Sequence, residues 1–203
     1  EKPSPGMACI PGGPFLRGSD QHGRNARPQR RVTVSTFYID VHEATTPAFV
    51  ACVKAGLCTR PKPYLRYRGF HGKRQPAVPV SWHNALAICL MQGKRLPTEA
   101  EWEKAARTTD GRTYPWGEAA PTCRRAAFRG CRPATTRAVG SFPPNPYGLF
   151  DMAGNGYEWV MDWYTPCYGG CNKACGDACR GRDPRGPCAG VLRCKGHRRR
   201  VLR

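Results

Sequence analysis

Cysteine is the residue type in this chain that could take part in the widest range of chemistry, and it accounts for 12 of the 203 residues. Four cysteines recur at every fourth position, and such a ladder can either hold zinc, copper or an iron–sulfur cluster or close local disulfides. These four are Cys167, Cys171, Cys175 and Cys179. The glycines among them argue against a helix that would align the thiols. Local disulfides are therefore favoured, and a metal site and free thiols stay open as alternatives.

Two further pairs of cysteines are close enough in sequence to close short loops. Cys52 and Cys58 form one such pair, and Cys123 and Cys131 form the other. Disulfides of this kind indicate an oxidising compartment, so we expect an extracytoplasmic protein, either periplasmic or secreted. Residues 1–6 are polar and lack an apolar signal-peptide core, as a mature or truncated chain would. A cytosolic protein with many free thiols is the alternative.

The usual motifs of hydrolytic and metal-dependent enzymes are absent from the sequence. The five histidines show no HExxH spacing, and no serine lies in a GxSxG nucleophile elbow. Glu99, Glu101 and Glu103 fall together, but they stand at the predicted N-terminus of a helix, where the helix dipole favours negative charge. We interpret these glutamates as structural and predict no catalytic residue from spacing.

The chain is strongly basic. Its 33 lysines and arginines against 14 aspartates and glutamates give a formal net charge of +19, and nine of the basic residues fall between Arg180 and Arg203. Such a charge favours acidic partners such as nucleic acid, an anionic lipid surface or a sulfated glycan. No basic stripe interleaved with aromatic residues and no recognition-helix signature occurs, so we expect no specific nucleic-acid binding.

The elements that must position any site are short. Apolar periodicity and capping residues predict one helix from a cap at Thr45 or Thr46 to Gly56, and two more over residues 82–92 and 98–107. The third begins with a Thr-Glu-Ala-Glu capping box. No apolar run reaches the roughly 18–20 residues that a membrane-spanning helix requires, so no membrane span is expected.

Short strands complete the expected architecture. Residues 7–10 and 15–18 flank a Pro-Gly-Gly-Pro turn and are expected to form a hairpin, and residues 31–40 are predicted to form one further strand. Two to three helices with short irregular strands predict an α+β domain of low regular secondary structure. Because the composition changes near Pro166, we expect a core over residues 1–165 and a Cys/Gly/Arg-rich insertion or tail over residues 166–203.

Two segments resemble the formylglycine-generating enzyme family, whose members are also called sulfatase-modifying factors. Residues 93–107 read GKRLPTEAEWEKAAR and resemble the family's GKRLPTEAEWE segment. Residues 145–159 read NPYGLFDMAGNGYEW and resemble its NxYGLxDMxGNVWEW segment. Weaker matches, among them residues 37–40 followed by Glu43, occur in family order from residue 6 to residue 165.

The resemblance implies a fold, an ion and an activity. The fold is C-type-lectin-like and contains structural calcium. The family activity is the oxidation of a sulfatase cysteine to formylglycine by oxygen and a copper ion that two cysteines hold. The resemblance also implies that Cys89 pairs with a cysteine near the C-terminus of family members.

The second segment would bind calcium if the family pattern holds. By resemblance the ligands are Asp151, the carbonyl oxygens of Gly154 and Gly156, and Glu158. Calcium takes roughly six to eight oxygen ligands, which carboxylates at both ends of a glycine-rich turn can help to supply. The alternative is that the two carboxylates only cap turns, and Asn155 is interpreted as a turn residue. The family's other calcium site is expected to be lost, because Ala127 and Cys131 stand where oxygen-bearing side chains would be.

The resemblance stops short of the catalytic cysteines. In the family they follow a GGSW-type motif, which comes after an Arg-Val-hydrophobic-Arg run such as residues 200–203. We therefore expect a family domain truncated before that segment and inactive as it stands. No catalytic or cofactor-binding residue is assigned, and copper is expected only if the segment exists.

Two kinds of partner follow from these readings. A formylglycine-generating-enzyme-like domain would meet a sulfatase-type polypeptide. A non-catalytic lectin-like binding module would instead use its basic tail, residues 166–203, to bind an acidic protein or an anionic glycan.

Overall fold

The computed structural model describes residues 5–21, 23–61, 69–165, 180–194 and 199–203. The predicted cysteine ladder from Cys167 to Cys179 lies outside these ranges. The helices in the described residues are α1 (Thr46–Lys54), α2 (Trp82–Met91) and α3 (Glu99–Arg107), with the 3-10 turns η1 (Arg24–Ala26) and η4 (Pro187–Gly190). The strands are β1 (Met7–Ile10), β2 (Gly13–Arg17), β3 (Arg30–Val34), β4 (Phe37–Asp40), β5 (Trp159–Trp163) and β6 (Arg200–Leu202). Three helices and short strands within long loops make the α+β architecture of low regular secondary structure that the sequence predicts.

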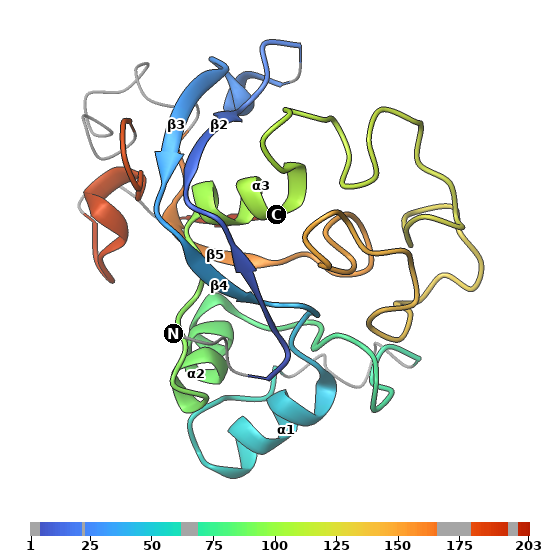
Figure 1. The fold of residues 1–203 in the computed structure, drawn as a ribbon. Helices are drawn as coiled ribbons and strands as arrows, with labels where there is room; N and C mark the ends of the chain where they lie inside the picture. The colour runs from blue at the N-terminus through green and yellow to red at the C-terminus, as the bar shows by residue number, and fades with distance from the viewer. Residues whose placement is uncertain (1–4, 22, 62–68, 166–179, 195–198) are drawn as a thin grey trace.

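The first four strands form one long ribbon and not a hairpin followed by a strand. Strand β1 pairs antiparallel with β4, and β2 pairs antiparallel with β3. The register is the same on both sides of the junction, because Ile10 pairs with Phe37 before it and Gly13 pairs with Val34 after it. Figure 1 shows β1 and β2 continuing in one direction beside β3 and β4. The predicted hairpin was therefore wrong, since the Pro-Gly-Gly-Pro signal marks an interruption of one strand.

The interruption of the ribbon has a clear structural cause. Pro11 has no N–H group to donate, and the Gly12 N–H donates instead to Thr36 Oγ1 at 3.0 Å. A Cβ atom at Gly12 would lie 2.9 Å from the Thr36 nitrogen, so the close approach of the two chains requires glycine there. The buried Lys104 of α3 donates from Nζ to the carbonyl oxygens of Pro11 at 2.6 Å and Gly13 at 3.0 Å. Helix α3 thus holds the ribbon at the point where its own ladder is broken.

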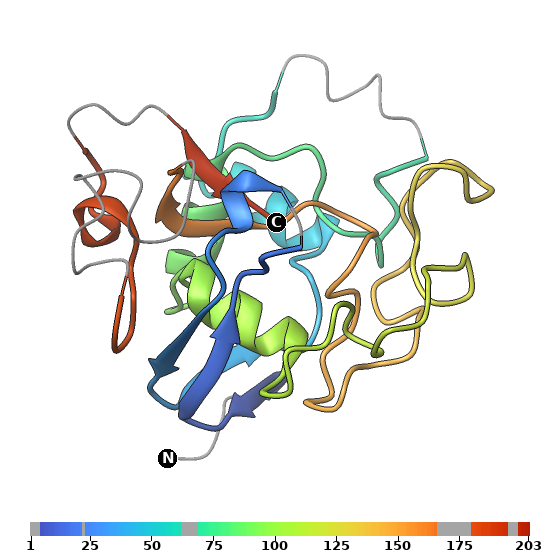
Figure 2. The same cartoon turned by 90° about the horizontal axis from the view of Figure 1, so that it is seen from above.

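The main core lies between the ribbon and α3. Figure 2 shows α3 lying against β2, and the two elements are in contact. The ribbon contributes Ile10, Phe15, Val32, Val34 and Phe37, the helix contributes Ala100, Ala105 and Ala106, and a later loop adds Leu149 and Met152. The small alanines allow the helix backbone to approach the strands closely, so this helix orients the loops that follow it.

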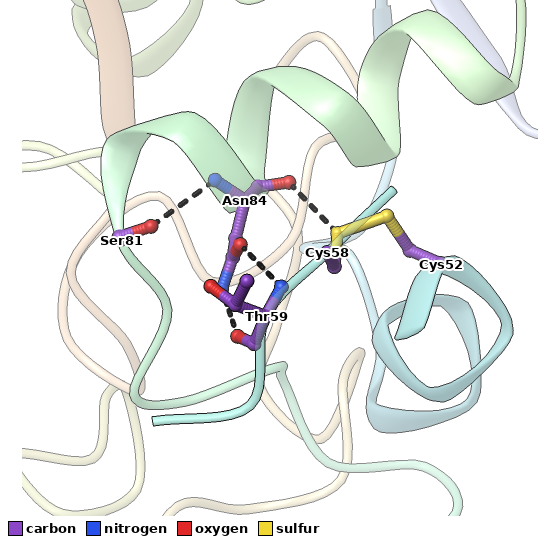
Figure 3. The surroundings of a disulfide bond; sticks show 5 residues. All are labelled: Cys52, Cys58, Thr59, Ser81 and Asn84. Atoms are coloured by element: carbon purple, nitrogen blue, oxygen red, sulfur yellow. Dashed lines mark hydrogen bonds between the residues drawn. A yellow bond between two sulfur atoms is a disulfide. The ribbon is translucent and has the colours of Figure 1, made fainter. Parts of the chain in front are cut away.

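A second core joins α1 to α2 (Figure 3). Cys52 and Cys58 form the disulfide predicted from their spacing, and it closes the loop at the end of α1. Ser81 Oγ accepts from the Asn84 N–H at the start of α2, at 3.2 Å. The Asn84 side chain exchanges two hydrogen bonds with the backbone of Thr59, at 2.8 and 3.1 Å. The disulfide and this buried asparagine therefore anchor the same connection to α2.

Helix α3 begins with the predicted capping box. The Glu101 N–H donates to Thr98 Oγ1 at 3.2 Å, and Glu101 Oε2 accepts from the Thr98 N–H at 2.7 Å. Glu101 also pairs with Arg95, while Glu99 pairs with Arg17 at 2.7 Å. Glu103 pairs with Arg107, again at 2.7 Å. The three glutamates therefore sit in ion pairs that fasten the helix, in line with a structural role.

Removing the cap should weaken this helix measurably. We expect Thr98→Ala to lower the free energy of unfolding by about 1 kcal/mol, because the Glu101 N–H at the first turn loses its acceptor, the Thr98 hydroxyl. Urea denaturation of the oxidised protein measures the effect. Thr109→Ala, at an exposed position beyond the helix, is the control and should leave the midpoint unchanged. Equal midpoints for Thr98→Ala and the parent would contradict the prediction.

Parts of the C-terminal region pack on the core. The Arg182 backbone bridges Thr33 of β3, and Asp183 accepts hydrogen bonds from the Ser35 N–H and hydroxyl. Strand β6 pairs antiparallel with β5, between Trp159–Leu202 and Trp163–Arg200. The predicted division of the chain at residue 165 stays a prediction, but residues on both sides of it share one packed body.

Candidate cation site and adjoining cavity

Three carboxylates from distant parts of the chain converge beside the loop that follows Leu149. Glu43 comes just after β4, whereas Asp151 and Glu158 stand at the two ends of the glycine-rich turn. Negative charge within the group raises the pKa of two members: Asp151 acts on both glutamates, and Glu158 acts on Glu43. The structure therefore brings the two predicted carboxylate ligands together and adds a third acidic side chain.

Local hydrogen bonds fix the turn in place. Asn145 accepts the N–H groups of Tyr147 and Leu149 and donates to the carbonyl oxygen of Ala105 at 2.6 Å, which ties the start of the segment to α3. Asp151 has a φ of 58° and Asn155 a φ of 62°, so the backbone turns twice through the left-handed region. This coiling places both ends of the turn near one another.

Asn155 is a turn residue, as the sequence predicts, and its side chain also makes hydrogen bonds to Glu43 and to Arg137. Its side-chain amide donates to Glu43 Oε2 at 2.7 Å, and its Oδ1 accepts from the Arg137 N–H at 2.7 Å. Its own N–H donates to the carbonyl oxygen of Ala127 at 2.8 Å. The residue thus holds the carboxylates and the preceding loop in one arrangement.

Two carboxylate oxygens at this site are buried without a hydrogen-bond partner in the described structure. They are Asp151 Oδ1 and Glu43 Oε1. Two other oxygens have donors: Asp151 Oδ2 accepts from the Gly140 N–H at 2.7 Å, and Glu158 Oε2 accepts from Trp102 Nε1 at 2.9 Å. A buried anionic oxygen without a donor is costly, and a bound cation is the direct way to offset that cost.

Burial shifts all three carboxyl groups toward the neutral form. Desolvation, followed by the charges of Glu158 and Asp151, raises the pKa of Glu43 to about 9. Desolvation also raises the pKa of Glu158 to about 7, with Asp151 adding to the shift. The pKa of Asp151 is raised by burial as well. The protein alone does not neutralise these groups, so the site is built for an added positive charge or for protons.

The glycines of the turn are required by close packing. A Cβ atom at Gly154 would lie 2.4 Å from the Ala127 carbonyl oxygen, and one at Gly156 would lie 2.7 Å from Glu43 Oε1. Among the residues that the structure describes, no group of three or more His, Cys, Asp or Glu side chains is arranged to hold a metal ion. A cation here would therefore need backbone oxygens as well, and the carbonyls of Gly154 and Gly156 are the ones that the sequence resemblance implies. The donor set of carboxylate and carbonyl oxygens suits calcium.

The loop that carries Ala127 and Cys131 is closed by a disulfide. Cys131 is bonded to Cys123, as their spacing predicts. A third disulfide, which the sequence analysis did not pick out, joins Cys188 to Cys194. Ala127 contributes its backbone oxygen to Asn155, not a side-chain ligand. The disulfide closes this loop covalently, and the expected loss of the second calcium site stays a prediction.

A cavity of about 620 Å³ lies next to the carboxylates, and Glu43 and Glu158 belong to its wall. Helix α2 contributes Cys89, and the Asp40–Lys94 ion pair, 2.6 Å long, stands at the same wall. Burial, with a smaller effect from Asp40, raises the pKa of the Cys89 thiol to about 11. At neutral pH this thiol is protonated and is a poor nucleophile and a poor metal ligand.

Free thiols are scarce where the structure can be described. In those ranges only Cys9 and Cys89 are unpaired, and Cys9 is exposed on β1 and absent from the cavity wall. The described residues therefore provide no facing pair of thiolates for copper. No disulfide to Cys89 is seen there either, so the pairing implied by the resemblance stays a prediction.

The sequence profile described as "Sulfatase-modifying factor enzyme 1-like domain" matches residues 1–200. The chain belongs to this family, named FGE-sulfatase. The fold agrees, because a solved structure titled "Structure of PvdO from Pseudomonas aeruginosa" superposes with a TM-score of 0.67 at 29% identity. That match covers 81% of this chain and 73% of the other. The expected α+β formylglycine-generating-enzyme fold is confirmed.

Relatives within the FGE-sulfatase family have different names. "Serine/threonine-protein kinase pkn1" of Chlamydia pneumoniae is 39% identical over 78% of this chain and 28% of its own length. "Formylglycine-generating enzyme" of Thermomonospora curvata is 32% identical over 93% of this chain and 80% of its own length. "Inactive C-alpha-formylglycine-generating enzyme 2" of Mus musculus is 33% identical over 80% and 70% respectively. The chain thus spans under a third of the kinase that it matches.

The disulfides also bear on the compartment. Three disulfides in the described residues indicate that this FGE-sulfatase domain matures in an oxidising environment. None of the helices in the described ranges has the length and apolar character needed to cross a membrane.

Sequence reasoning missed Glu43 as a member of the site. The residue appeared only within a weaker family match, and it lies more than a hundred positions before Asp151. A lone glutamate after a strand is not a distinctive signal. Only the fold places it against the glycine-rich turn.

Proposed function

We propose that this FGE-sulfatase domain is a calcium-stabilised recognition module without copper-dependent oxidase activity of its own. The observation that carries the proposal is the state of the cysteines: six described cysteines are locked in disulfides, and Cys89 has a pKa raised to about 11. Copper chemistry of the family type needs two thiolates that face one another. The mouse relative is named as inactive, which agrees with a family in which some members keep the fold without the enzymatic activity.

Calcium is proposed as the resident ion of the carboxylate site. Asp151 and Glu158 would supply carboxylate oxygens, and Gly154 and Gly156 would supply carbonyl oxygens. The unpartnered Oε1 of Glu43 adds a further acceptor. The ion would supply positive charge that lets the three acidic groups remain ionised inside the protein. Its role is to hold the turn and the neighbouring loop, and no chemical step is assigned to it.

An oxidase is the second candidate function. It is favoured by the 32% identity to the Thermomonospora formylglycine-generating enzyme over 93% of this chain. In that case a sulfatase-type polypeptide would be the substrate.

A direct assay separates the two functions. The purified, oxidised protein is incubated with copper, oxygen, a thiol reductant and a sulfatase-type peptide containing the target cysteine. We expect no aldehyde product by mass spectrometry or by an aldehyde-reactive probe, because no copper-binding thiol pair stands in the described structure. The Thermomonospora enzyme under the same conditions is the positive control. Conversion of the peptide by this chain would overturn the proposal in favour of the oxidase.

A further inference from the structure

The acidic residues of this chain are unevenly distributed. None of the 14 falls within residues 44–98 or within residues 119–150. The structure brings parts of these two acid-free stretches together. The Val139 N–H donates to the Arg74 carbonyl oxygen at 2.7 Å, and Gln75 Nε2 donates to the Thr136 carbonyl oxygen at 2.6 Å. Two loops that lack any negative side chain therefore form one surface.

Five cations project from this surface, and we call them the basic face. They are Lys73, Arg74, Arg124, Arg129 and Arg132, all exposed. None of them makes an ion pair with a carboxylate in the described part of the chain. Several acidic residues are meanwhile buried, including Glu99, Glu101, Glu103, Asp151 and Asp162. The basic face therefore has no direct carboxylate partner among the described residues.

The basic face is held in a defined arrangement. The Cys123–Cys131 disulfide brings Arg124 close to Arg132 in space. The Arg137 guanidinium donates to the Arg132 carbonyl oxygen, which links this loop to the segment that contacts Arg74. These links connect the segments of Arg124, Arg132 and Arg74 to one another. A backbone that is already fixed by a disulfide and hydrogen bonds loses little conformational freedom on binding.

We propose that the basic face binds a linear acidic polysaccharide through its carboxylate or sulfate groups. Several exposed guanidinium groups on linked loops suit a chain with regularly repeated anions, and each planar guanidinium can bind a carboxylate or a sulfate in a bidentate manner. The disulfides indicate an oxidising compartment, where acidic polysaccharides are the usual linear polyanions. The inference rests on the proposed recognition function and names its partner, but its test is independent of the oxidase assay.

A membrane surface fits the basic face less well. Peripheral membrane binding uses a broad apolar face together with cations, and the one exposed large apolar side chain between Arg124 and Arg132 is Phe128, at 44% exposure. A single exposed ring among arginines is suited to stacking on the C–H face of a sugar.

The experiment compares two variants of the full oxidised chain. The first changes Arg74, Arg124, Arg129 and Arg132 to Gln. The backbone carbonyls of Arg74 and Arg132, which hold the loops, remain in that variant. The control changes Arg31, Lys54, Arg185 and Arg193 to Gln, which are also exposed and lie on β3, on α1 and in the C-terminal region. Both variants have the same formal charge, and the control also removes cations of the proposed basic tail.

Binding is measured by fluorescence anisotropy with a heparin dodecasaccharide and with an alginate oligouronate of the same length. We expect the parent to bind at least one of the two oligosaccharides. Its affinity should fall as the salt concentration rises from about 50 to about 200 mM, because binding releases counterions. The basic-face variant should bind at least about tenfold more weakly, with a smaller salt slope, and the control should stay within about twofold of the parent.

The two oligosaccharides separate sulfate from carboxylate recognition, and either result supports the proposal. Phosphatidylglycerol vesicles are tested in parallel. The proposal is overturned if neither oligosaccharide binds, if binding to vesicles alone is seen, or if the control loses as much affinity as the basic-face variant. Circular dichroism and intact disulfides in both variants establish that the comparison is between folded proteins.

Discussion

Removal of calcium is expected to lower the melting temperature of this protein by several degrees. A ligand that binds only the native state at about 100 times its Kd adds about 2.7 kcal/mol to the free energy of unfolding. For a chain of this size 1 kcal/mol corresponds to about 2–4 °C, so excess EGTA should cost about 5–10 °C. The physical reason is that Glu43, Asp151 and Glu158 lose the charge that would offset their mutual repulsion and burial. Differential scanning calorimetry with EGTA, and with calcium restored, measures the effect.

Variants at the site make this expectation specific. Asp151→Asn should abolish the calcium-dependent shift, because it removes a carboxylate whose Oδ1 has no donor in the described structure. Asp110→Asn is the matched control, since Asp110 is exposed and paired with Arg112 far along the chain from the turn. That variant should retain the full shift. An unchanged melting temperature of the parent in EGTA would remove calcium from this account.

Glu43→Gln distinguishes a cation site from carboxyl groups that simply stay protonated. In EGTA the variant should melt at a higher temperature than the parent, because a neutral amide avoids the cost of burying a negative charge. That cost is the main reason why the pKa of Glu43 is raised to about 9. On addition of calcium the variant should gain less than the parent, since one negative charge is missing. A full calcium response in Glu43→Gln would show that Glu43 does not contribute to the ion.

Local signals predicted the helices well. The observed α2 begins at the predicted residue and ends one residue earlier, and the capping box at Thr98 is present as read from the sequence. A cap is made by side chains within four positions of one another, so its information is contained in the sequence of one turn. The disulfides of Cys52 and of Cys123 were predictable for the same reason, because each closes a loop of a few residues.

Non-local arrangements were not predictable in this way. The hairpin prediction was wrong because Pro-Gly-Gly-Pro can mark either a chain reversal or an interruption within one strand. Only the pairing with residues 30–40 decides between the two. Glu43 joins Asp151 only through the packing of β4 on the later loop. Arg74 likewise meets the loop of Arg132 through backbone bonds between distant segments. The high positive charge was visible in the composition, but its arrangement on these two loops was not.

Lys104 illustrates how the fold uses charge to complete an incomplete ladder. The residue is fully buried on α3, and its ammonium donates to the carbonyl oxygens on both sides of the ribbon's interruption. Burial lowers the pKa of this ammonium, which marks a real cost of enclosing it. The cost is offset by charge-assisted hydrogen bonds to the carbonyl oxygens of Pro11 and Gly13, which stand at this break. The motif lysine is thus part of the framework that sets β1 and β2 on α3.

We expect Lys104→Met to lower the free energy of unfolding by about 2–4 kcal/mol, since the variant loses two charge-assisted hydrogen bonds between α3 and the ribbon. Methionine has a similar length and fills the same space, so a cavity contributes little to the loss. Guanidinium chloride denaturation followed by tryptophan fluorescence measures the change.

Lys94→Met is the matched control for this prediction. Lys94 also carries an ion pair, to Asp40, but both side chains are partly exposed, and such pairs contribute at most about 1 kcal/mol. Similar losses in the two variants would show that a general loss of positive charge, and not the support of the broken ladder, governs stability. A larger loss of unfolding free energy for Lys104→Met, with an unchanged dependence on denaturant concentration, would support the prediction. It would mean that hydrogen bonds from α3 help to keep the ribbon in one register across the interruption between β1 and β2.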